Sequence, residues 1–495
     1  MADILFGQSY YLRFDPKLYA SMQPYPPLGA LYAAGLMRQE GYSVALFDAM
    51  LAETEQEWAA ALDKHTPRFA VLFEDNFNYL SKMCLMRMRE AAFTMIHMAT
   101  ERGATVIICG ADATDHTAQY IAQGATYVIR GEGEETLREL MASLSERVDK
   151  KPETISGLSF VDASGQLQQT LPRPPLRDLD VLPFPAWDLV DRERYRAIWM
   201  ERHGYYSVNM VTTRGCPYSC NWCAKPIWGQ RYNVRSAENV VAELKHLIEV
   251  MAPDHIWFAD DIFGLKPGWV QRFAELVEAA NIKIPFKSLN RGDLLLQEDT
   301  IPALKRAGAH TIWIGAESGS QKILDAMDKG TQVEEIYETA HRLQAADIRV
   351  GFFLQFGYLG ETRADIEKTI QMVRDLMPDD IGISVSYPLP GTKFYERVKN
   401  ELGDKTNWRD SDDLAMLYHG PYSTAFYRQL HTVIHKEYRA RKTWRRRLEW
   451  RPWRRSDLRQ IGAMLYHVVT LPSARARLDA LERVPQSSVI SLNAA

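Results

Sequence analysis

The sequence predicts an α/β protein with three parts: a doubly wound parallel sheet, a partial (β/α)6 barrel, and a mainly helical C-terminal region. Three observations support this prediction. Two series of short, β-branched apolar runs alternate with stretches long enough for helices, a proline-rich segment separates the two series, and the chain beyond residue 400 has a helical pattern. The chain has 495 residues, of which 46% are hydrophobic, so it can bury more than one core.

Residues 1–145 carry the first series and are predicted to form a Rossmann-like domain. Strands of a parallel sheet that helices cover on both faces are almost uniformly apolar, because neither face meets water. Five runs fit this pattern, so we expect five parallel strands: DILFG, SVALFDA, FAVLFEDN, TVIICGAD and TYVIRGEG. The isolated Cys84 and Cys109 are interpreted as buried core residues.

Residues 146–200 are predicted to connect the first domain to the second. The stretch GLSFVDASGQLQQT has the pattern of a β-hairpin, and LPRPPLRDLDVLPFPAW follows it. Proline cannot occupy the interior of a regular helix or of a central strand. The five prolines of the second stretch therefore indicate an irregular connector.

Residues 201–400 carry the second series and are predicted to form a partial barrel of the TIM type. Six apolar runs, each followed by a plausible helix, are the expected strands: SVNMVTTRG, HIWFADD, PFKSLNR, TIWIGAES, VGFFLQFG and IGISVSYP. In such barrels the chemistry gathers at the carboxyl ends of the strands. The polar residues that end these runs are therefore the candidates for a functional site.

Residues 401–495 are predicted to be a helical, locally basic region. Between Lys436 and Arg455 there are ten basic residues against two acidic ones, with Trp444, Trp450 and Trp453 among them. A solvated basic helix is one interpretation, and a peripheral contact with an anionic membrane surface or an anionic ligand is another. No recognisable nucleic-acid-binding motif is present, so no nucleic-acid partner is expected.

The composition favours a cytoplasmic protein. The formal net charge is −4, no run of eighteen apolar residues occurs, and the N-terminus lacks the pattern of a signal peptide. Thiols stay reduced in the cytoplasm, so clustered cysteines there indicate a metal site or catalysis.

Three of the five cysteines lie close together, at Cys216, Cys220 and Cys223. The spacing C-x3-C-x2-C falls at the end of the first barrel strand, where a loop can direct three thiolates toward one centre. Zinc would normally need a fourth protein ligand, and the nearest histidine, His203, has no ligand-like spacing. A four-iron cluster held by three cysteines leaves one iron open to a small molecule.

With Trp222 before the third cysteine, the motif resembles that of the radical S-adenosylmethionine (SAM) superfamily, C-x3-C-x-aromatic-C. The resemblance implies that Cys216, Cys220 and Cys223 are the catalytic and metal-binding residues of a [4Fe-4S] cluster. It implies that the open iron chelates SAM, which is cleaved reductively to a 5'-deoxyadenosyl radical. It also implies an electron donor such as flavodoxin or ferredoxin.

The resemblance further implies that residues at the strand ends hold SAM. Asp260 or Asp261 would meet its ammonium group, although one of them has a helix N-cap as an alternative role. Glu317 would accept hydrogen bonds from the ribose hydroxyls. Arg291 would meet the SAM carboxylate or a substrate anion, with a structural salt bridge as its alternative. The expected SAM contacts are Trp222, Asp260, Asp261, Arg291, Glu317, Ser318, Gln355 and Gly357.

Three stretches of the first domain resemble the cobalamin-binding domain that precedes the barrel in one subgroup of the superfamily. They are PPLGALYAAGLMRQEGYSVALFDA, GADATDH and YVIRGEGEETLREL, which extends the resemblance to about residues 1–400. No D-x-H-x-x-G motif is present, so no histidine is offered as a lower cobalt ligand. The expected cobalamin contacts, where glycines admit close approach and helix starts suit a phosphate, are Pro26, Pro27, Gly29, Glu74, Asp75, Asn76, Gly110, Asp112, Gly131, Glu132 and Gly133.

The function predicted from these resemblances is cobalamin-dependent methylation of an unactivated carbon in a small-molecule substrate. An oxygen-independent cyclase of the magnesium-protoporphyrin monomethyl ester type is the first alternative, because NWRDSDDLAMLYHGPYSTAFYRQLH looks similar to that subgroup. A zinc-containing nucleic-acid-binding protein is an alternative of a different class. A methylthiotransferase is disfavoured, since Cys84 and Cys109 cannot supply a second set of three ligands.

Overall fold

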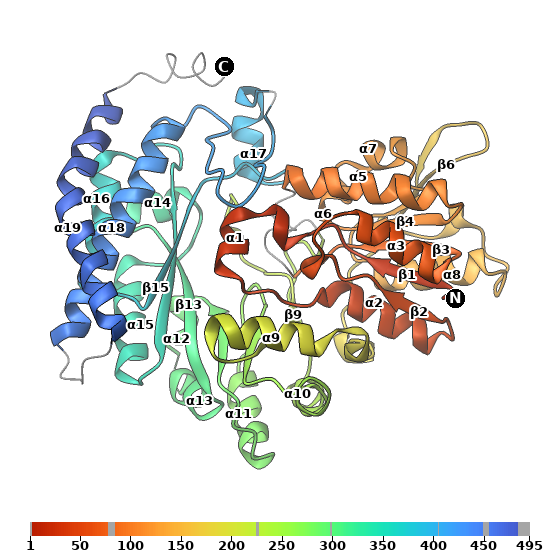
Figure 1. Cartoon of the computed structure of the whole chain (residues 1–495), viewed down its shortest axis with the longest axis horizontal. Helices are drawn as coiled ribbons and strands as arrows, with labels where there is room; N and C mark the ends of the chain where they lie inside the picture. The colour runs from red at the N-terminus through yellow and green to blue at the C-terminus, as the bar shows by residue number, and fades with distance from the viewer. Residues whose placement is uncertain are drawn as a thin grey trace.

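The computed structural model describes residues 2–77, 85–223, 227–297, 299–403, 405–448 and 455–483, and it confirms the predicted fold class. An N-terminal sheet, a curled parallel sheet and a helical C-terminal region follow one another along the chain (Figure 1). Cys84, Trp450 and Trp453, which the sequence singled out, lie outside the described residues.

The N-terminal sheet has seven strands in the order β2-β1-β3-β4-β5-β6-β7. The first five are parallel, as predicted, and the predicted hairpin pairs antiparallel with β5 and so extends the same sheet. The strands are β1 (Ile4–Gly7), β2 (Val44–Leu46), β3 (Phe69–Phe73), β4 (Thr105–Cys109), β5 (Tyr127–Ile129), β6 (Leu158–Val161) and β7 (Leu167–Gln169).

Helices cover both faces of this sheet, and each face has its own apolar core. One core contains Trp58 and Met95, and the other contains Phe6 and Leu137. Cys109 is buried in the second core, as predicted. The helices are α2 (Leu28–Gln39), α3 (Gln56–His65), α5 (Met86–Glu101), α6 (Ala111–Asp115), α7 (Thr117–Ala122) and α8 (Glu134–Leu144).

The segment between β1 and α2 lies between the N-terminal sheet and the curled sheet (Figure 1). It contains η1 (Leu12–Phe14) and α1 (Pro16–Ser21), and Asp15 caps α1 by accepting from the Leu18 amide at 3.2 Å. The same carboxylate accepts from Ser411 Oγ at 2.6 Å, and Trp199 Nε1 donates to Pro24 O at 2.8 Å. The segment therefore joins the N-terminal unit to the barrel and to the C-terminal region.

The curled sheet has six parallel strands in the order β15-β14-β13-β12-β11-β8. Its edge strands β8 and β15 do not pair with each other, so the barrel is partial, as predicted. The strands are β8 (Ser207–Met210), β11 (His255–Phe258), β12 (Phe286–Asn290), β13 (Ala309–Glu317), β14 (Arg349–Phe356) and β15 (Asp380–Val385).

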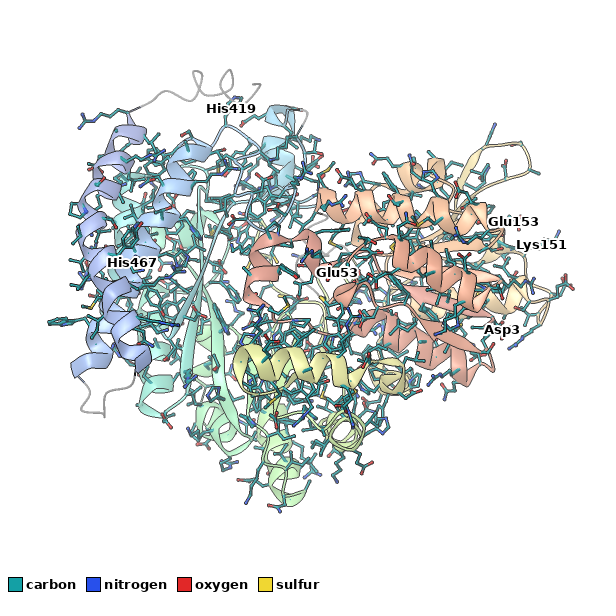
Figure 2. The ribbon with its side chains drawn as sticks, in the orientation of Figure 1. Asp3, Glu53, Lys151, Glu153, His419 and His467 are labelled. Carbon is teal, nitrogen blue, oxygen red and sulfur yellow. The ribbon has the colours of Figure 1, made fainter. Side chains whose placement is uncertain are left out.

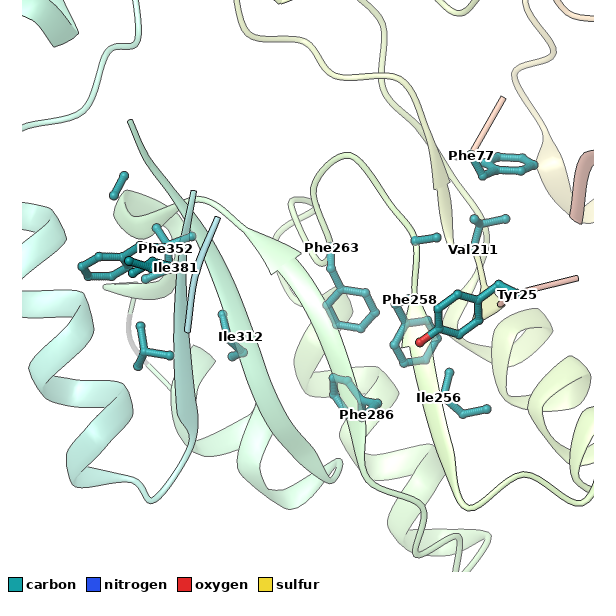
Figure 3. Packing of buried hydrophobic residues seen from close by; sticks show 14 of the residues in the cluster. Tyr25, Phe77, Val211, Ile256, Phe258, Phe263, Phe286, Ile312, Phe352 and Ile381 are labelled. Carbon is teal, nitrogen blue, oxygen red and sulfur yellow. The ribbon is translucent and has the colours of Figure 1, made fainter. Parts of the chain in front are cut away.

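Helices cover the outer face of the curled sheet and enclose an aromatic core. Phe258 lies 5.1 Å from Phe286 and 4.8 Å from Phe263 between ring centroids (Figure 3). The helices are α10 (Ala237–Met251), α11 (Trp269–Ala279), α12 (Gly292–Leu295), α13 (Thr300–Arg306), α14 (Gln321–Ala326), α15 (Val333–Ala345) and α16 (Arg363–Leu376).

The first barrel strand is shorter than predicted. The run SVNMVTTRG divides into β8 and a separate strand β9 (Thr213–Arg214), which pairs antiparallel with β10 (Asn233–Val234). The amides of Thr212 and Thr213 donate to the carboxylate of Asp260 instead of continuing the barrel ladder. An interaction distant in sequence therefore ends the strand.

The connector combines the β6–β7 hairpin with an irregular proline-rich stretch, and the described C-terminal region is helical before Leu402 and after Ser423. The proline-rich stretch contains only η4 (Leu179–Val181) and η5 (Trp187–Leu189), and α9 (Arg192–His203) follows it. After the barrel come α17 (Lys393–Val398), η6 (Lys399–Glu401), α18 (Thr424–Leu448) and α19 (Arg455–Glu482). None of the described helices is long and apolar enough to cross a membrane.

The carboxyl edges of the two sheets face the same interior region. Asp3, which precedes β1, lies at the end of the molecule farthest from the barrel (Figure 2), so β1 and its parallel neighbours run toward the barrel. One apolar cluster continues from Tyr25 and Phe77 of the N-terminal unit to Val211 and Phe258 of the barrel. This interface is the place where the predicted site residues meet.

Candidate active site

The cysteine loop leaves β9 through a tight turn. Gly215 has a φ of +80°, and a Cβ on it would lie 2.4 Å from the carbonyl oxygen of Arg231. Only glycine fits this conformation and this close approach. Cys216, Cys220 and Cys223 follow, and all three are half-buried. No three His, Cys, Asp or Glu side chains among the described residues already converge as the ligands of one metal would.

Asn221, which the sequence did not single out, anchors the cysteine loop. Its amide donates to Met327 O at 3.0 Å and its carbonyl accepts from the Phe394 amide at 2.9 Å. Its side chain donates to Ala326 O at 2.8 Å and accepts from Tyr358 Oη at 2.6 Å. A buried asparagine between two candidate ligands was the available signal, but its partners lie more than a hundred residues away.

Asp260 lies beneath the start of this loop and positions it. It is 1% exposed, and its carboxylate accepts from Thr212 N at 2.7 Å, Thr212 Oγ1 at 2.6 Å and Thr213 N at 2.9 Å. Burial raises the pKa of Asp260 to about 6. Both carboxylate oxygens of Asp260 already accept hydrogen bonds from Thr212 and Thr213, so this side chain stabilises the turn. The neighbouring Asp261 is exposed.

A cationic group lies beside the cysteine loop. The Arg291 guanidinium stacks on the Tyr218 ring at 3.6 Å from its centroid and donates to Lys329 O at 3.1 Å. Arg291 also forms the alternative salt bridge, to Asp293 at 3.0 Å. The pKa of Lys329 is raised, because Glu317 and Cys220 together outweigh the opposing effect of burial. These two cations give the site a positive field suited to an anionic cluster.

Glu317 pairs with Lys329 inside this group. Lys329 Nζ donates to Glu317 Oε1 at 2.9 Å, and both side chains are buried. Glu317 has a φ of +56°, and the register of β13 with β14 shifts between Gly315 and Glu317. A positive φ is unfavourable for glutamate and is typical of functional sites. Lys329 was missed because it lies after α14, outside every strand end.

The remaining predicted SAM contacts lie at the ends of neighbouring strands, and several have internal partners. Ser318 Oγ lies 3.1 Å from Thr369 Oγ1, and Gln355 Nε2 donates to Ser386 Oγ at 3.0 Å. Gly357 has a φ of +81° and its amide donates to Glu361 Oε2 at 2.7 Å. Trp222 packs against the apolar cluster of Tyr358 and Phe394, and its Nε1 is buried with no acceptor among the described residues.

On the opposite side, polar residues end β3 of the N-terminal sheet. Glu74 Oε1 accepts from the Ser9 amide at 2.9 Å, while Oε2 is buried without a donor among the described residues. Burial raises the pKa of Glu74 to about 7. Asp75 Oδ1 accepts from the Gly29 amide at 3.3 Å, and the buried Asn76 Oδ1 likewise has no donor in the described part of the chain.

Other predicted cobalamin contacts serve internal packing or ion pairs. Asp112 binds the buried Arg89 through two contacts of 2.7 and 2.5 Å and accepts from Tyr120 Oη at 2.6 Å. A Cβ on Gly110 would lie 2.7 Å from Glu74 Cβ, and one on Gly133 would lie 2.4 Å from Cys109 Sγ. Close protein atoms at both positions thus already require glycine, and their role as cobalamin contacts stays a prediction.

The remaining predicted cobalamin contacts either have free space around them or contact the barrel. Gly131 has a φ of +78°, and a Cβ added to it would lie 3.9 Å from the carbonyl oxygen of Ile227, its nearest neighbour. Pro27 precedes α2, and Pro26 O accepts from Asn209 Nδ2 at 3.1 Å. These contacts place the start of α2 directly against β8.

Arg214, immediately before the Gly-Cys of the loop, ties the two units together. It is 3% exposed, and its guanidinium donates to Glu132 at 2.5 Å and to Glu134 at 2.7 Å. Glu132 lies in the turn after β5, and Glu134 is the first residue of α8. The predicted cobalamin contact Glu132 thus pairs with the strand that precedes the cysteine loop, and no local pattern predicts this pairing.

A cavity of about 220 Å³ lies between the units. Asn209, Trp257 and Lys287 line it from the barrel, and Asp75 and Phe77 line it from the end of β3. The inserted segment contributes Tyr25. The cavity is thus bounded by the residues after β3 and by the inner face of the barrel.

Comparison with known proteins supports the chemistry that the cysteines predicted. Residues 210–373 match the family model described as the radical SAM superfamily. The match confirms the predicted radical SAM domain and, with the relatives named below, that the chain is an enzyme.

Several relatives match most of the chain, among them a methyltransferase and a cyclase. An uncharacterised methyltransferase of Pyrococcus horikoshii is 27% identical over 392 residues, which cover 78% of this chain and 81% of the relative. The anaerobic magnesium-protoporphyrin IX monomethyl ester cyclase of Rubrivivax gelatinosus is 24% identical over 386 residues, covering 77% and 67%.

A solved structure shares the whole architecture. The cobalamin-dependent S-adenosylmethionine radical enzyme OxsB, determined with aqua-cobalamin bound, superposes with a TM-score of 0.71 at 17% identity. The superposition covers 100% of this chain and 75% of OxsB. At this identity the likeness shows a common fold for the N-terminal unit, barrel and C-terminal region.

Proposed function

We propose that the chain is a cobalamin-dependent radical SAM enzyme that methylates an unactivated carbon of a small-molecule substrate. One observation carries the proposal. Arg214 introduces the cysteine loop and forms ion pairs with Glu132 and Glu134 at the carboxyl edge of the N-terminal sheet. The two predicted cofactor sites therefore adjoin across one buried contact, which suits a reaction that uses both groups on one substrate.

The residues of the barrel edge fit a [4Fe-4S] cluster with SAM. Cys216, Cys220 and Cys223 would ligate three irons, and the cations Arg291 and Lys329 would offset the negative charge of the thiolates. Glu317 keeps one carboxylate oxygen beyond its contact with Lys329, which would accept from the ribose. Asn221 holds the loop in place. When bound, these groups supply hydrogen abstraction from the substrate.

The end of β3 fits a ligand rich in amide donors such as cobalamin. Buried polar atoms are normally paired, yet Glu74 Oε2 and Asn76 Oδ1 have no donor among the described residues. They would accept from the carboxamides of a corrin, and cobalamin would supply the methyl group. Their burial also excludes water from this edge.

An oxidative cyclase of the magnesium-protoporphyrin monomethyl ester type is the second candidate, favoured by the cyclase relative of Rubrivivax gelatinosus. The cavity of about 220 Å³ is smaller than the roughly 300–1,000 Å³ usual for drug-sized ligands. A complete tetrapyrrole exceeds it. This size favours a substrate smaller than a tetrapyrrole, and so counts against this cyclase.

The proposal also includes the partners implied by this chemistry. The cluster requires an electron from a protein such as flavodoxin or ferredoxin. The basic α18 would be a site for peripheral contact with an anionic membrane surface, since Trp444 is 61% exposed. The acidic Glu437 of α18 is already paired with Arg374 of α16 and Arg475 of α19, each at 2.6 Å.

The proposal is tested on anaerobically purified full-length protein. Iron, cobalt and zinc are quantified, and SAM with a reductant is then added. We expect iron with cobalt, formation of 5'-deoxyadenosine, and S-adenosylhomocysteine as the mark of methyl transfer. Deoxyadenosine without S-adenosylhomocysteine in the presence of substrate would favour the cyclase, and zinc without iron would refute both.

Cys220→Ala provides the matched variant. We expect at least a hundredfold loss of 5'-deoxyadenosine formation and a loss of iron, with an unchanged circular dichroism spectrum, because the half-buried thiol has no large packing role. Ser219→Ala is the control, since Ser219 is exposed in the same loop. A Cys220→Ala protein that retains iron and cleaves SAM at the normal rate would contradict the assignment.

A further inference from the structure

The cavity between the two units contains an ordered row of side chains. Strand pairing places Asn209 of β8 opposite Trp257 of β11, and Trp257 opposite Lys287 of β12. Residues in register on neighbouring parallel strands project from the same face of a sheet. All three line the cavity, so they form one row on the inner wall of the barrel.

Lys287 brings a positive charge into this row without an ion-pair partner among the described residues. Its Nζ lies 4.7 Å from the Trp257 ring centroid and 5.3 Å from that of Tyr25. Besides these cation–π contacts, Tyr205 and Asp380 act on Lys287 electrostatically, and no carboxylate in the described part of the chain forms an ion pair with it. Burial lowers the pKa of Lys287 to about 8. An ammonium group held among aromatic rings gains from any anion that reaches it.

Asn209 supplies a second, independent indication of a ligand. The residue is 2% exposed, and its Nδ2 donates to Pro26 O at 3.1 Å. That bond fixes the orientation of the carboxamide, and the remaining Oδ1 is buried with no donor among the described residues. Buried acceptors are rarely left unpaired, so a ligand that offers an N–H or O–H group fits here.

The rest of the lining is mostly apolar and includes Leu12, Met50, Phe77 and Ala259. Ala259 directly precedes Asp260, which holds the cysteine loop, and Phe77 follows the edge predicted to face cobalamin. A molecule in the cavity therefore lies between the two proposed cofactor sites. That position is required of the substrate.

We infer that this cavity is the substrate site and that its substrate is a small, largely apolar organic anion whose acidic group pairs with Lys287. Calling the bound molecule a substrate rests on the proposed function, whereas the anion site rests only on the residues that line the cavity. Asn209 Oδ1 accepts a hydrogen bond from a donor group near the acidic group. A carboxylate and a phosphate share this chemistry, and the experiment distinguishes them.

The test measures binding to the full-length, anaerobically purified protein without turnover. The probes are 3-phenylpropanoate, its neutral amide 3-phenylpropanamide, and phenyl phosphate, with calorimetry as the readout. We expect one anionic probe to bind at least tenfold more tightly than the amide, because a charge-assisted contact adds to the apolar contacts. The tighter of the two anions identifies the acidic group.

Variants assign the effect to Lys287. Lys287→Met is expected to weaken binding of the anion about tenfold to hundredfold and to leave binding of the amide unchanged. Lys287→Arg should retain most of the preference for the anion. Lys283→Met is the control, because Lys283 is exposed before the same strand. Equal binding of acid and amide, no binding of either anion, or an unchanged affinity in Lys287→Met would overturn the inference.

The same preparations separate this inference from the proposed function. Iron content and 5'-deoxyadenosine formation are measured for the wild-type protein and for Lys283→Met. A protein that lacks iron but discriminates anion from amide through Lys287 refutes the proposed enzyme and keeps the anion site. A protein that cleaves SAM but does not discriminate anion from amide refutes the anion site and keeps the proposed enzyme.

Discussion

At the scale of single residues, the Glu317–Lys329 pair combines strain with buried charge. Glu317 adopts a φ of +56° and contacts Lys329 Nζ at 2.9 Å, with both side chains buried. A buried ion pair adds little net stability, but removing one partner leaves an uncompensated charge. Loss of either Glu317 or Lys329 is therefore expected to destabilise the folded protein.

Lys329→Met is expected to destabilise the barrel by about 3–5 kcal/mol, because Glu317 would remain buried and unpaired. The double variant Glu317→Gln/Lys329→Met should recover a large part of this loss. Chemical denaturation of the wild type, Lys329→Met, Glu317→Gln and the double variant gives the coupling energy. As a control, Lys305→Met breaks an exposed pair with Asp347 and should cost less than about 1 kcal/mol. Equal losses in the two single lysine variants would show that the buried pair is not special.

At the scale of elements, the break between β8 and β9 creates the cysteine loop. Thr212 and Thr213 give their amides to Asp260, which allows β9 to turn away and pair with β10. Asp260 comes from the end of the neighbouring strand β11. The loop geometry is thus determined by a carboxylate that lies about fifty residues further along the chain.

The raised pKa of Asp260 makes this turn sensitive to pH. In the folded protein the pKa is raised from 3.8 to about 6, so the group favours folding most when it is protonated in both states, below about pH 4. That contribution is lost as the pH rises to about 6 and stays lost above it. The two-unit shift corresponds to about 3 kcal/mol.

Asp260→Asn removes this titration. We expect the stability of the wild-type protein relative to Asp260→Asn to fall by about 2–3 kcal/mol between pH 4 and pH 7. Urea denaturation across this range measures the difference. Asp261→Asn, at the exposed neighbouring position, should follow the wild-type profile. Parallel profiles for the wild type and Asp260→Asn would contradict the buried carboxylate as the cause.

At the scale of the whole molecule, the two units share an apolar core and a buried ionic contact. The cluster that contains Tyr25, Phe77 and Phe258 extends through both, and Arg214 pairs with Glu132 and Glu134 across the interface. The inserted segment before α2 adds hydrogen bonds to α9 and to the C-terminal region. These contacts indicate that the units unfold together.

Arg214→Met tests this coupling, because it leaves two buried glutamates without their cation. We expect a loss of about 3–5 kcal/mol and a separation of the single calorimetric transition into two. Iron content should also fall, since Arg214 introduces the cysteine loop. Arg38→Met, which removes an exposed pair with Asp188, is the control and should keep one transition. A single, unshifted transition in Arg214→Met would refute the coupling.

The sequence by itself determined the fold class and the chemistry of the cysteines. Apolar runs of strand length and the C-x3-C-x2-C spacing are local patterns, and local patterns can be recognised from the sequence alone. The same reading identified Glu317 and Glu74 as residues at strand ends. It could not assign partners to them, because a partner is fixed by packing and not by spacing.

The tertiary structure alone decided which polar residues have partners within the protein and which line a cavity. Asp260 and Asp112 are bound within the protein, whereas Lys287 and Asn209, in the middle of their strands, line the cavity. Asn221, Arg214 and Lys329 became visible only through partners that lie twelve to more than a hundred residues away. Burial, register and hydrogen-bond satisfaction depend on distances between remote segments, and a linear sequence does not contain those distances.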